Sequence, residues 1–261
     1  MVLTIYQVDA FADKVFKGNP AAVIPLEAWI DDGLMQQVAM ENNLAETVFF
    51  VKTDAGYHIR WFTPEFEIDL CGHATLASAY IIKNFLEPHA EEINFSTQKA
   101  GIVKASAKDG MYTLDFPSRI PEQCEIPGKL FPSLGINNAV AVLRSRDYFV
   151  VLPNEEAVRN VEPDYTLMKK LDAIGVIITA KGHDADVVSR CFYPGAGIPE
   201  DPVTGSAHCN IVPYWSEKLG KKKLFCQQIS PRHGDLQCEL VGDRVLMSGK
   251  CVLFMQGEVY L

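Results

Sequence analysis

Hydrophobic and polar residues follow two different periods along the chain, and both periods occur in each half. Short apolar or alternating runs predict β-strands, as in LTIYQVDAF and TVFFV early in the chain and NAVAVL and YFVVL later. Helical spacing in DDGLMQQVAMEN and DYTLMKKLDAI predicts one surface helix in each half. Because Gly, Asn, Asp and Pro separate the strand runs, we expect mostly antiparallel sheets and an α+β fold.

A different kind of helix is predicted after Gly72, where the run ATLASAYIIKNFL is apolar on almost every side. A helix without a polar face is buried, so we expect a sheet curled around it. The corresponding segment after Gly205 contains Pro213. Because proline has no backbone N–H, we expect a kink or a short first segment in that helix.

The two halves match each other when they are aligned at an offset of 133 residues. Gly72 then aligns with Gly205, and Gly101 aligns with Gly234. The order of elements also agrees: early strands, a glycine turn, a helix and three further strands. We therefore predict a duplication with two pseudo-symmetric domains, residues 1–118 and 119–261, joined by a proline-rich linker. The additional last strand, CVLFMQGEVYL, could return to pair with the first domain.

Composition narrows the classes of function. A net charge of −9 and a pI of about 5.2 argue against nucleic acid as a partner. No apolar run is long enough for a membrane helix, and no signal peptide is evident. Seven cysteines without a C-x-x-C spacing are typical of a reduced, cytoplasmic protein. Neither a dinucleotide fingerprint nor a metal-ligand spacing is found, so we expect no cofactor and no metal.

Each glycine turn begins a helix, whose first N–H groups and dipole attract anions. We expect Gly72 and Gly205 to bind the carboxylate of a small acid substrate from two sides of a cleft between the domains. The expected contacts are backbone amides, without Arg or Lys. The usual acid–base residue types lie at or near these turns. The candidates are Glu46, His73, Asp201 and Ser206. Each could instead be an ordinary strand-start, turn or capping residue.

Four blocks together resemble the phenazine-biosynthesis isomerase (PhzF-like) family. They are VDAFADKVFKGNPAAVI, LAETVFF, RWFTPEFEIDLCGHATLASAY and EDPVTGSAH. The resemblance implies the diaminopimelate-epimerase-like fold, with a curled sheet around a central helix in each domain, and it implies a homodimer.

The resemblance also implies cofactor-free isomerisation of a small carboxylic acid, with a proton moved between carbons. The family's catalytic residues fall on Glu46, His73, Asp201 and Ser206. The family's serine before the glutamate is replaced by Ala45, a substrate-binding position, so the substrate is expected to differ.

Two alternatives remain open from the sequence. A cysteine-dependent racemase or epimerase on the same fold would use Cys71 and a second thiol at the equivalent position, but that residue is Thr204. A non-catalytic binding protein would keep the fold and would tolerate loss of Glu46.

Overall fold

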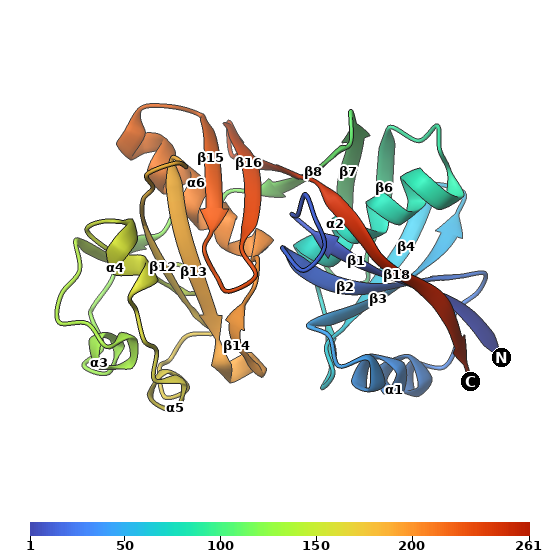
Figure 1. Cartoon of the computed structure of the whole chain (residues 1–261), viewed down its shortest axis with the longest axis horizontal. Helices are drawn as coiled ribbons and strands as arrows, with labels where there is room; N and C mark the ends of the chain where they lie inside the picture. Colours follow the sequence, from blue (N-terminus) through green and yellow to red (C-terminus); the bar gives the residue numbers. More distant parts are fainter. The chain divides into compact units, whose positions relative to one another are not determined.

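The computed structural model describes all residues, 1–261, and divides into two compact units. One unit contains residues Met1–Phe116 and Leu246–Leu261, and the other contains Pro117–Val245. Each unit combines a β-sheet with a central helix, as Figure 1 shows. The architecture is the predicted α+β class, although the sheet of each unit is mixed and includes parallel pairs of strands.

The first unit is built on nine strands and a buried helix. Its strands are β1 (Val2–Ala10), β2 (Asn19–Leu26), β3 (Glu46–Thr53), β4 (Gly56–Phe62), β5 (Glu67–Ile68), β6 (Glu92–Ser96), β7 (Ile102–Lys108), β8 (Met111–Pro117) and β18 (Cys251–Tyr260). Its helices are α1 (Asp32–Asn42) and α2 (Gly72–Ile81), and α2 continues as a π-helical turn, Ile82–Leu86.

Helix α2 is the centre of the first unit. It contacts β1, β2, β3, β7 and β18, so strands surround it on several sides. Nearly all of its side chains are buried, including the polar ones. The apolar pattern after Gly72 therefore predicted this helix and its burial. Helix α1 forms an outer layer on β3 and β4, where Met35, Val38 and Phe49 share a separate apolar core.

The last strand of the chain belongs to the sheet of the first unit. Strand β18 pairs antiparallel with β1 from Val2–Tyr260 to Ala10–Cys251, with one bulge between Gln7 and Val8. Strand β1 pairs on its other side with β2. It is therefore an inner strand whose neighbours come from opposite ends of the sequence.

The second unit repeats the pairing order of the first. Its strands are β9 (Glu122–Gln123), β10 (Ala141–Arg144), β11 (Tyr148–Val151), β12 (Val176–Lys181), β13 (Val187–Tyr193), β14 (Ile198–Asp201), β15 (Lys223–Gln228), β16 (Gly234–Val241) and β17 (Arg244–Gly249), the last crossing the division between units. Its helices are α3 (Leu130–Leu134), α4 (Glu155–Arg159), α5 (Tyr165–Met168), the 3₁₀ turn Pro194–Ala196 and α6 (Gly205–Leu219).

The repeat can be followed strand by strand. Strands β2 and β3 are parallel, as are β11 and β12. The pair β3–β4 is antiparallel like β12–β13, and the parallel pair β4–β6 corresponds to β13–β15. In each unit a glycine turn then begins the central helix, which follows the short strand β5 or β14 and precedes β6 or β15. The internal duplication expected from the glycine spacing is thus visible in the topology.

Of the two outcomes expected at Pro213, a kink or a short first segment, the short first segment is not found. Helix α6 is continuous over 15 residues with Pro213 inside it. Proline at this position leaves the Cys209 carbonyl without its usual helical donor. The backbone N–H of Arg119 donates to that carbonyl at 2.8 Å, and the Asn210 side chain donates to the Arg119 carbonyl. The segment after β8 therefore fills the gap in the helix.

The predicted surface helix of the second unit is shorter than its sequence pattern indicated. Helix α5 is a single turn, capped by the Asp164 side chain, which accepts from the Leu167 N–H at 2.9 Å. Of its residues only Met168 is buried. Short helices need tertiary packing to persist, and this segment offers little apolar area for it.

No helix in the structure has both the length and the apolar character needed to cross a bilayer.

Candidate functional site

In the first unit, the predicted acid–base residues Glu46 and His73 lie side by side. Glu46 begins β3, and His73 is the second residue of α2. Glu46 Oε2 is 3.0 Å from His73 Nε2, and the exposed fractions of the two side chains are only 8% and 5%. The direction of approach does not satisfy hydrogen-bond geometry, and both atoms are otherwise unpartnered. The contact is therefore a buried ion pair, and no other hydrogen bond reaches either of its two facing atoms.

The other ring nitrogen of His73 contacts a residue that the sequence analysis missed. Asn19 Nδ2 is 3.1 Å from His73 Nδ1. Asn19 begins β2, and the parallel pairing of β2 with β3 brings the starts of both strands to one edge of the sheet. As oriented, the amide donates to a neutral ring; after a half-turn its oxygen accepts from an imidazolium. Asn19 can therefore serve both protonation states of His73.

Two opposing effects set the pKa of His73. Burial lowers it, but the neighbouring Cys71 and Glu46 raise it more, so that it lies well above its ordinary value. Burial raises the pKa of the Cys71 thiol to about 11, so the thiol is neutral near pH 7. The Glu46 carboxylate is therefore the group that we hold responsible for the raised pKa of His73.

In the second unit, Asp201 lies within a network of buried polar groups. Asp201 ends β14, and its carboxylate accepts a 2.5 Å hydrogen bond from the Thr204 hydroxyl. The Gln228 side chain donates to the Asp201 carbonyl at 2.6 Å and accepts from the Thr204 N–H at 2.8 Å. These bonds hold the loop before α6 in one conformation and fix the direction of the Asp201 carboxylate.

Ser206, the last predicted catalytic residue, has a charged neighbour that the sequence analysis did not predict. The guanidinium of Arg146 lies 3.4 Å from the Ser206 hydroxyl, through Nη2. A cation therefore lies beside this turn, while binding of a substrate carboxylate by the backbone amides alone stays a prediction. Arg146 lies 60 residues before Ser206 in sequence, and only the packing of the β10–β11 hairpin against α6 brings them together.

The three predicted substrate-binding residues lie at the starts of elements. Gly72 begins α2 and Gly205 begins α6, while Ala45 is half-buried immediately before β3. Neither of the N-cap residues, Cys71 and Thr204, makes the side-chain hydrogen bond that usually caps a helix. The substrate-binding roles stay predictions.

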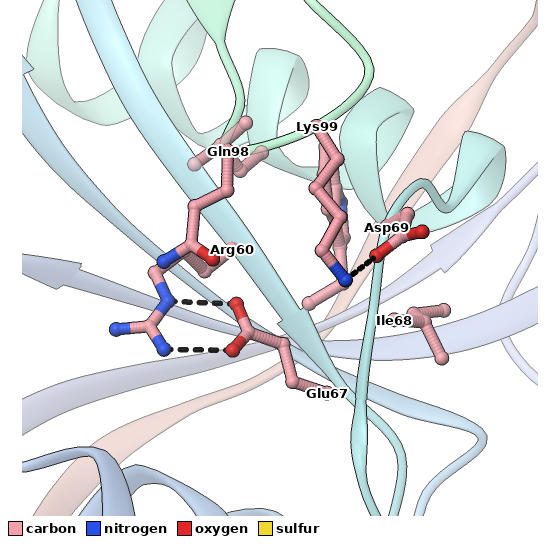
Figure 2. A pocket seen from close by; sticks show the side chains of 8 residues that line it. Arg60, Glu67, Ile68, Asp69, Gln98 and Lys99 are labelled. Carbon is pink, nitrogen blue, oxygen red and sulfur yellow. Dashed lines mark hydrogen bonds and ion pairs between the residues drawn. The ribbon is translucent and has the colours of Figure 1, made fainter.

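A separate hollow in the first unit contains none of the predicted residues. It is lined by Ile59, Arg60, Trp61, Glu67, Ile68, Asp69, Gln98 and Lys99. Figure 2 shows Arg60 bonded to Glu67 through two nitrogens and Lys99 paired with Asp69. The remaining Arg60 nitrogen, Nη1, donates to Asp32 at 2.7 Å. Both cationic side chains of this hollow are thus already paired with carboxylates of the protein.

Three of the buried groups could in principle hold a metal ion. One ligand atom each of Glu46, Cys71 and His73 lies within 4.8 Å of the others. A carboxylate, a thiolate and an imidazole are ligands that Zn²⁺ accepts. The thiol, however, contacts His73 Nδ1 at 3.4 Å whereas Glu46 faces Nε2, so the two ligands lie on different sides of the ring. One ion could not meet all three without rotation of the imidazole.

Comparisons with known proteins agree with the family resemblance. The family model described as "Phenazine biosynthesis-like protein" (PhzC-PhzF) matches residues 8–257. A Pseudomonas aeruginosa protein named an uncharacterized isomerase is 46% identical, with the whole of both chains covered. A Halalkalibacterium halodurans protein of the same designation is 44% identical, again over both full lengths.

Solved structures agree at the level of the fold. A PhzF-family phenazine biosynthesis protein from Enterococcus faecalis has a TM-score of 0.97 and 47% identity, with both chains fully covered. A hydroxyproline epimerase from Agrobacterium vitis has a TM-score of 0.63 at 11% identity, over 99% of this chain and 92% of that one. The diaminopimelate-epimerase-like fold is thereby confirmed, and so is the predicted enzyme class, an isomerase. The chain belongs to the phenazine biosynthesis-like (PhzF) protein family.

Proposed function

We propose that the protein is a cofactor-independent isomerase that moves a proton between two carbons of a small carboxylic acid. The single observation that carries the proposal is the buried pair of Glu46 and His73, whose facing atoms are 3.0 Å apart. A base and an acid held together away from water are the groups that a proton transfer at carbon requires. The raised pKa of His73 keeps it as the acid of the pair.

The proposed reaction conserves every atom of the substrate. The Glu46 carboxylate takes a proton from one carbon, and the electrons of that C–H bond form a new C=C bond. The electrons of the old double bond take up a proton from His73 Nε2 at the other carbon. Glu46 is then protonated and His73 neutral, and the pair returns to its starting state once the proton moves from Oε2 to Nε2, two atoms that lie 3.0 Å apart and that a small rotation of the side chains would align. The pair therefore restores itself without another cofactor.

Asp201 and Ser206 have supporting roles in the proposal. The Asp201 carboxylate, oriented by Thr204, is a second acid–base group, and the Ser206 hydroxyl is a hydrogen-bond donor to the substrate. That both glycine turns act on one substrate in a shared cleft stays a prediction. A homodimeric state and a cytoplasmic location also stay predictions, and light scattering of the purified protein tests the first.

The thiol mechanism is less well supported. A cysteine racemase needs a thiolate as its base. Burial holds the pKa of Cys71 at about 11, and the equivalent N-cap residue of α6 is Thr204. The second thiol is therefore missing, and the first is held in its protonated form.

Deuterium exchange tests the proposal without knowledge of the substrate. The protein is incubated in D₂O with a library of small unsaturated and saturated carboxylic acids, and deuterium in the recovered acids is measured by mass spectrometry. We expect one class of acid to gain deuterium at carbon with the native protein and not with Glu46→Gln. No incorporation into any acid, or equal incorporation with Glu46→Gln, would contradict the proposed function.

A further inference from the structure

Arg146 lies at the tip of the hairpin formed by β10 and β11, in the segment 145–147, and no role was predicted for it. Its guanidinium forms a paired contact with the next residue, Asp147. Nε is 3.1 Å from Oδ1, and Nη2 is 2.7 Å from Oδ2. Asp147 is almost fully buried, and the guanidinium also lies 5.8 Å from the ring centre of Tyr193. The direction of the guanidinium is therefore set by groups that cannot move freely.

The hairpin tip is bonded to the first turns of α6. Asn210 donates to the Ser145 hydroxyl at 2.8 Å, and Arg146 Nη2 is 3.4 Å from the Ser206 hydroxyl. Residues 206 and 210 are four apart and so lie on the same face of the helix. Two adjacent residues of the tip thus contact one helix face at successive turns. These two contacts hold the positive charge of Arg146 at the start of α6.

Another arginine of the same unit provides a structural comparison. Arg190 also binds a carboxylate through Nε and Nη2, that of Glu200, but its Nη1 donates to the carbonyls of Val158, Arg159 and Val161. The Arg190 side chain is 12% exposed. The Arg146 side chain is 36% exposed, and its contacts with Asp147 and Ser206 use Nε and Nη2 but not Nη1, while the Tyr193 side chain lies beside the guanidinium. All three guanidinium nitrogens of Arg190 are thus bonded within the unit, whereas the contacts of Arg146 with Asp147 and Ser206 leave Nη1 unused.

Electrostatics favour an anion beside Arg146 Nη1. The N-terminus of a helix carries partial positive charge, so a guanidinium beside it is unfavourable unless an anion lies between them. Asp147 occupies the other edge of the guanidinium. A planar guanidinium can bind two carboxylates, one on each edge, with Nη1 supplying donors to the second.

We propose that Arg146 is a specificity-determining residue that binds the carboxylate of the ligand through Nη1, together with the Ser206 hydroxyl. That this ligand is the substrate rests on the proposed function, but the carboxylate contact itself does not. Asp147 acts as a positioning residue, because it orients the guanidinium and does not touch the ligand. At the glycine turn of Gly205, the anion would therefore be bound by a charged side chain and not by backbone amides alone.

The binding test uses probes that are available now. The unfolding temperature is measured with sodium benzoate, sodium succinate and sodium sulfate, each against sodium chloride at equal ionic strength. We expect the native protein to be stabilised by at least one carboxylate, because a ligand that binds only the folded state raises its stability. Arg146→Met should lose that shift, and Arg146→Lys should keep part of it, because an ammonium retains charge without the planar fork.

The matched control is Arg144→Met, on the same hairpin. It removes the same charge, but the Arg144 guanidinium is already bonded to Asp172 and Tyr148. Its carboxylate shift should equal that of the native protein. The proposal is overturned by an equal carboxylate shift in Arg146→Met, by loss of the shift in Arg144→Met as well, or by the absence of any shift in the native protein. A shift with sulfate alone identifies an adventitious ion only and also overturns it.

Kinetics separate this inference from the proposed function. With an acid found by deuterium exchange, Arg146→Met should raise KM by roughly 10- to 100-fold, as expected for loss of a charge-assisted hydrogen bond, and should change kcat much less. If Glu46→Gln abolishes exchange while Arg146→Met leaves KM unchanged, the function stands and the role of Arg146 falls. If carboxylate binding depends on Arg146 but no acid exchanges, the anion site stands and the isomerase proposal falls.

Discussion

The two glycine turns share a backbone plan but present different chemistry. Each begins the central helix of its unit and follows a short strand, β5 in the first unit and β14 in the second. At the first turn, His73 is fully enclosed with Glu46 and Asn19. At the second, Ser206 is half-buried and lies beside the partly exposed Arg146.

This difference indicates that the two turns of the duplicated fold are suited to different functions. A buried carboxylate–imidazole pair is suited to holding and moving a proton, because no water competes for it. A half-exposed hydroxyl beside a cation is suited to binding an anion from solvent. We therefore expect changes at the first turn to reduce the rate of the chemical step, and changes at the second to reduce affinity.

The largest effect should come from Glu46→Gln, which keeps the shape of the side chain and removes the base. We expect the exchange rate to fall by about 10²- to 10⁴-fold, the usual contribution of general acid–base catalysis.

Ser206→Ala should instead act mainly on KM, by roughly 10-fold. Steady-state kinetics of both variants check this, with circular dichroism to verify the fold. A loss of kcat in Ser206→Ala as large as that in Glu46→Gln would abolish the distinction.

The imidazoles of the two central helices should respond to pH in opposite directions. Burial lowers the pKa of His208 on α6 to about 4, although its Nδ1 contacts the Thr204 carbonyl at 2.9 Å. The unfolded chain binds this proton near pH 6.5, so folding stability falls as pH drops from 6.5 towards 4. The pKa of His73 is raised in the folded protein. Its contribution to stability is therefore fully present below pH 6.5 and is lost as pH rises from 6.5 through the raised folded pKa.

The effect of His208 can be measured by urea unfolding. Between pH 7 and pH 5, titration of this one residue should reduce the free energy of unfolding by about 2 kcal/mol. His208→Gln, which does not titrate, should show a pH dependence smaller by that amount, whatever its stability at pH 7. An unchanged pH dependence in the variant would mean that His208 is accessible to protons in the folded state.

An intermediate effect is expected from Asn19→Asp, which keeps the shape of the side chain and adds a charge beside His73 Nδ1. An adjacent carboxylate favours the imidazolium, so the pKa of His73 should rise further. The acid then releases its proton less readily, and kcat should fall by roughly 10-fold. NMR titration of the His73 ring is the decisive measurement. An unchanged titration would show that Asn19 does not control its protonation.

The smallest effect should come from Cys71→Ser. The thiol is buried and neutral, and it is 3.4 Å from His73 Nδ1, so a hydroxyl of similar size can replace it. We expect activity within about 3-fold of the native value, below the contribution of one neutral hydrogen bond. A loss greater than about 100-fold, together with inactivation by alkylation of Cys71, would favour the thiol mechanism instead.

Local patterns in the sequence predicted much of this architecture. The apolar run after Gly72 indicated a buried helix, and the paired glycines indicated the duplication, because each signal lies within a few consecutive residues. The family blocks drew attention to Glu46 and His73. The GNP stretch around Asn19 lay inside one of those blocks, but its amide became informative only once β2 and β3 were seen to start at one edge.

The remaining features depend on contacts between distant residues. Arg146 reaches Ser206 through a hairpin that precedes it by 60 residues, which no spacing rule could show. The continuity of α6 at Pro213 depends on the N–H of Arg119, from a segment that was predicted to be only a linker. The single turn of α5 reflects how little of its surface is covered, which the helical period of its sequence does not reveal.

The return of β18 to β1 has a consequence for the order of folding. Strand β1 precedes the other strands of its sheet in the sequence and β18 follows all of them, so during synthesis the sheet of the first unit stays open along one edge until β18 has been made. The second unit, continuous from Pro117 to Val245, has all its residues earlier. A nascent chain that ends before Cys251 would therefore expose the unpaired edge of β1, a strand edge open to pairing with other chains.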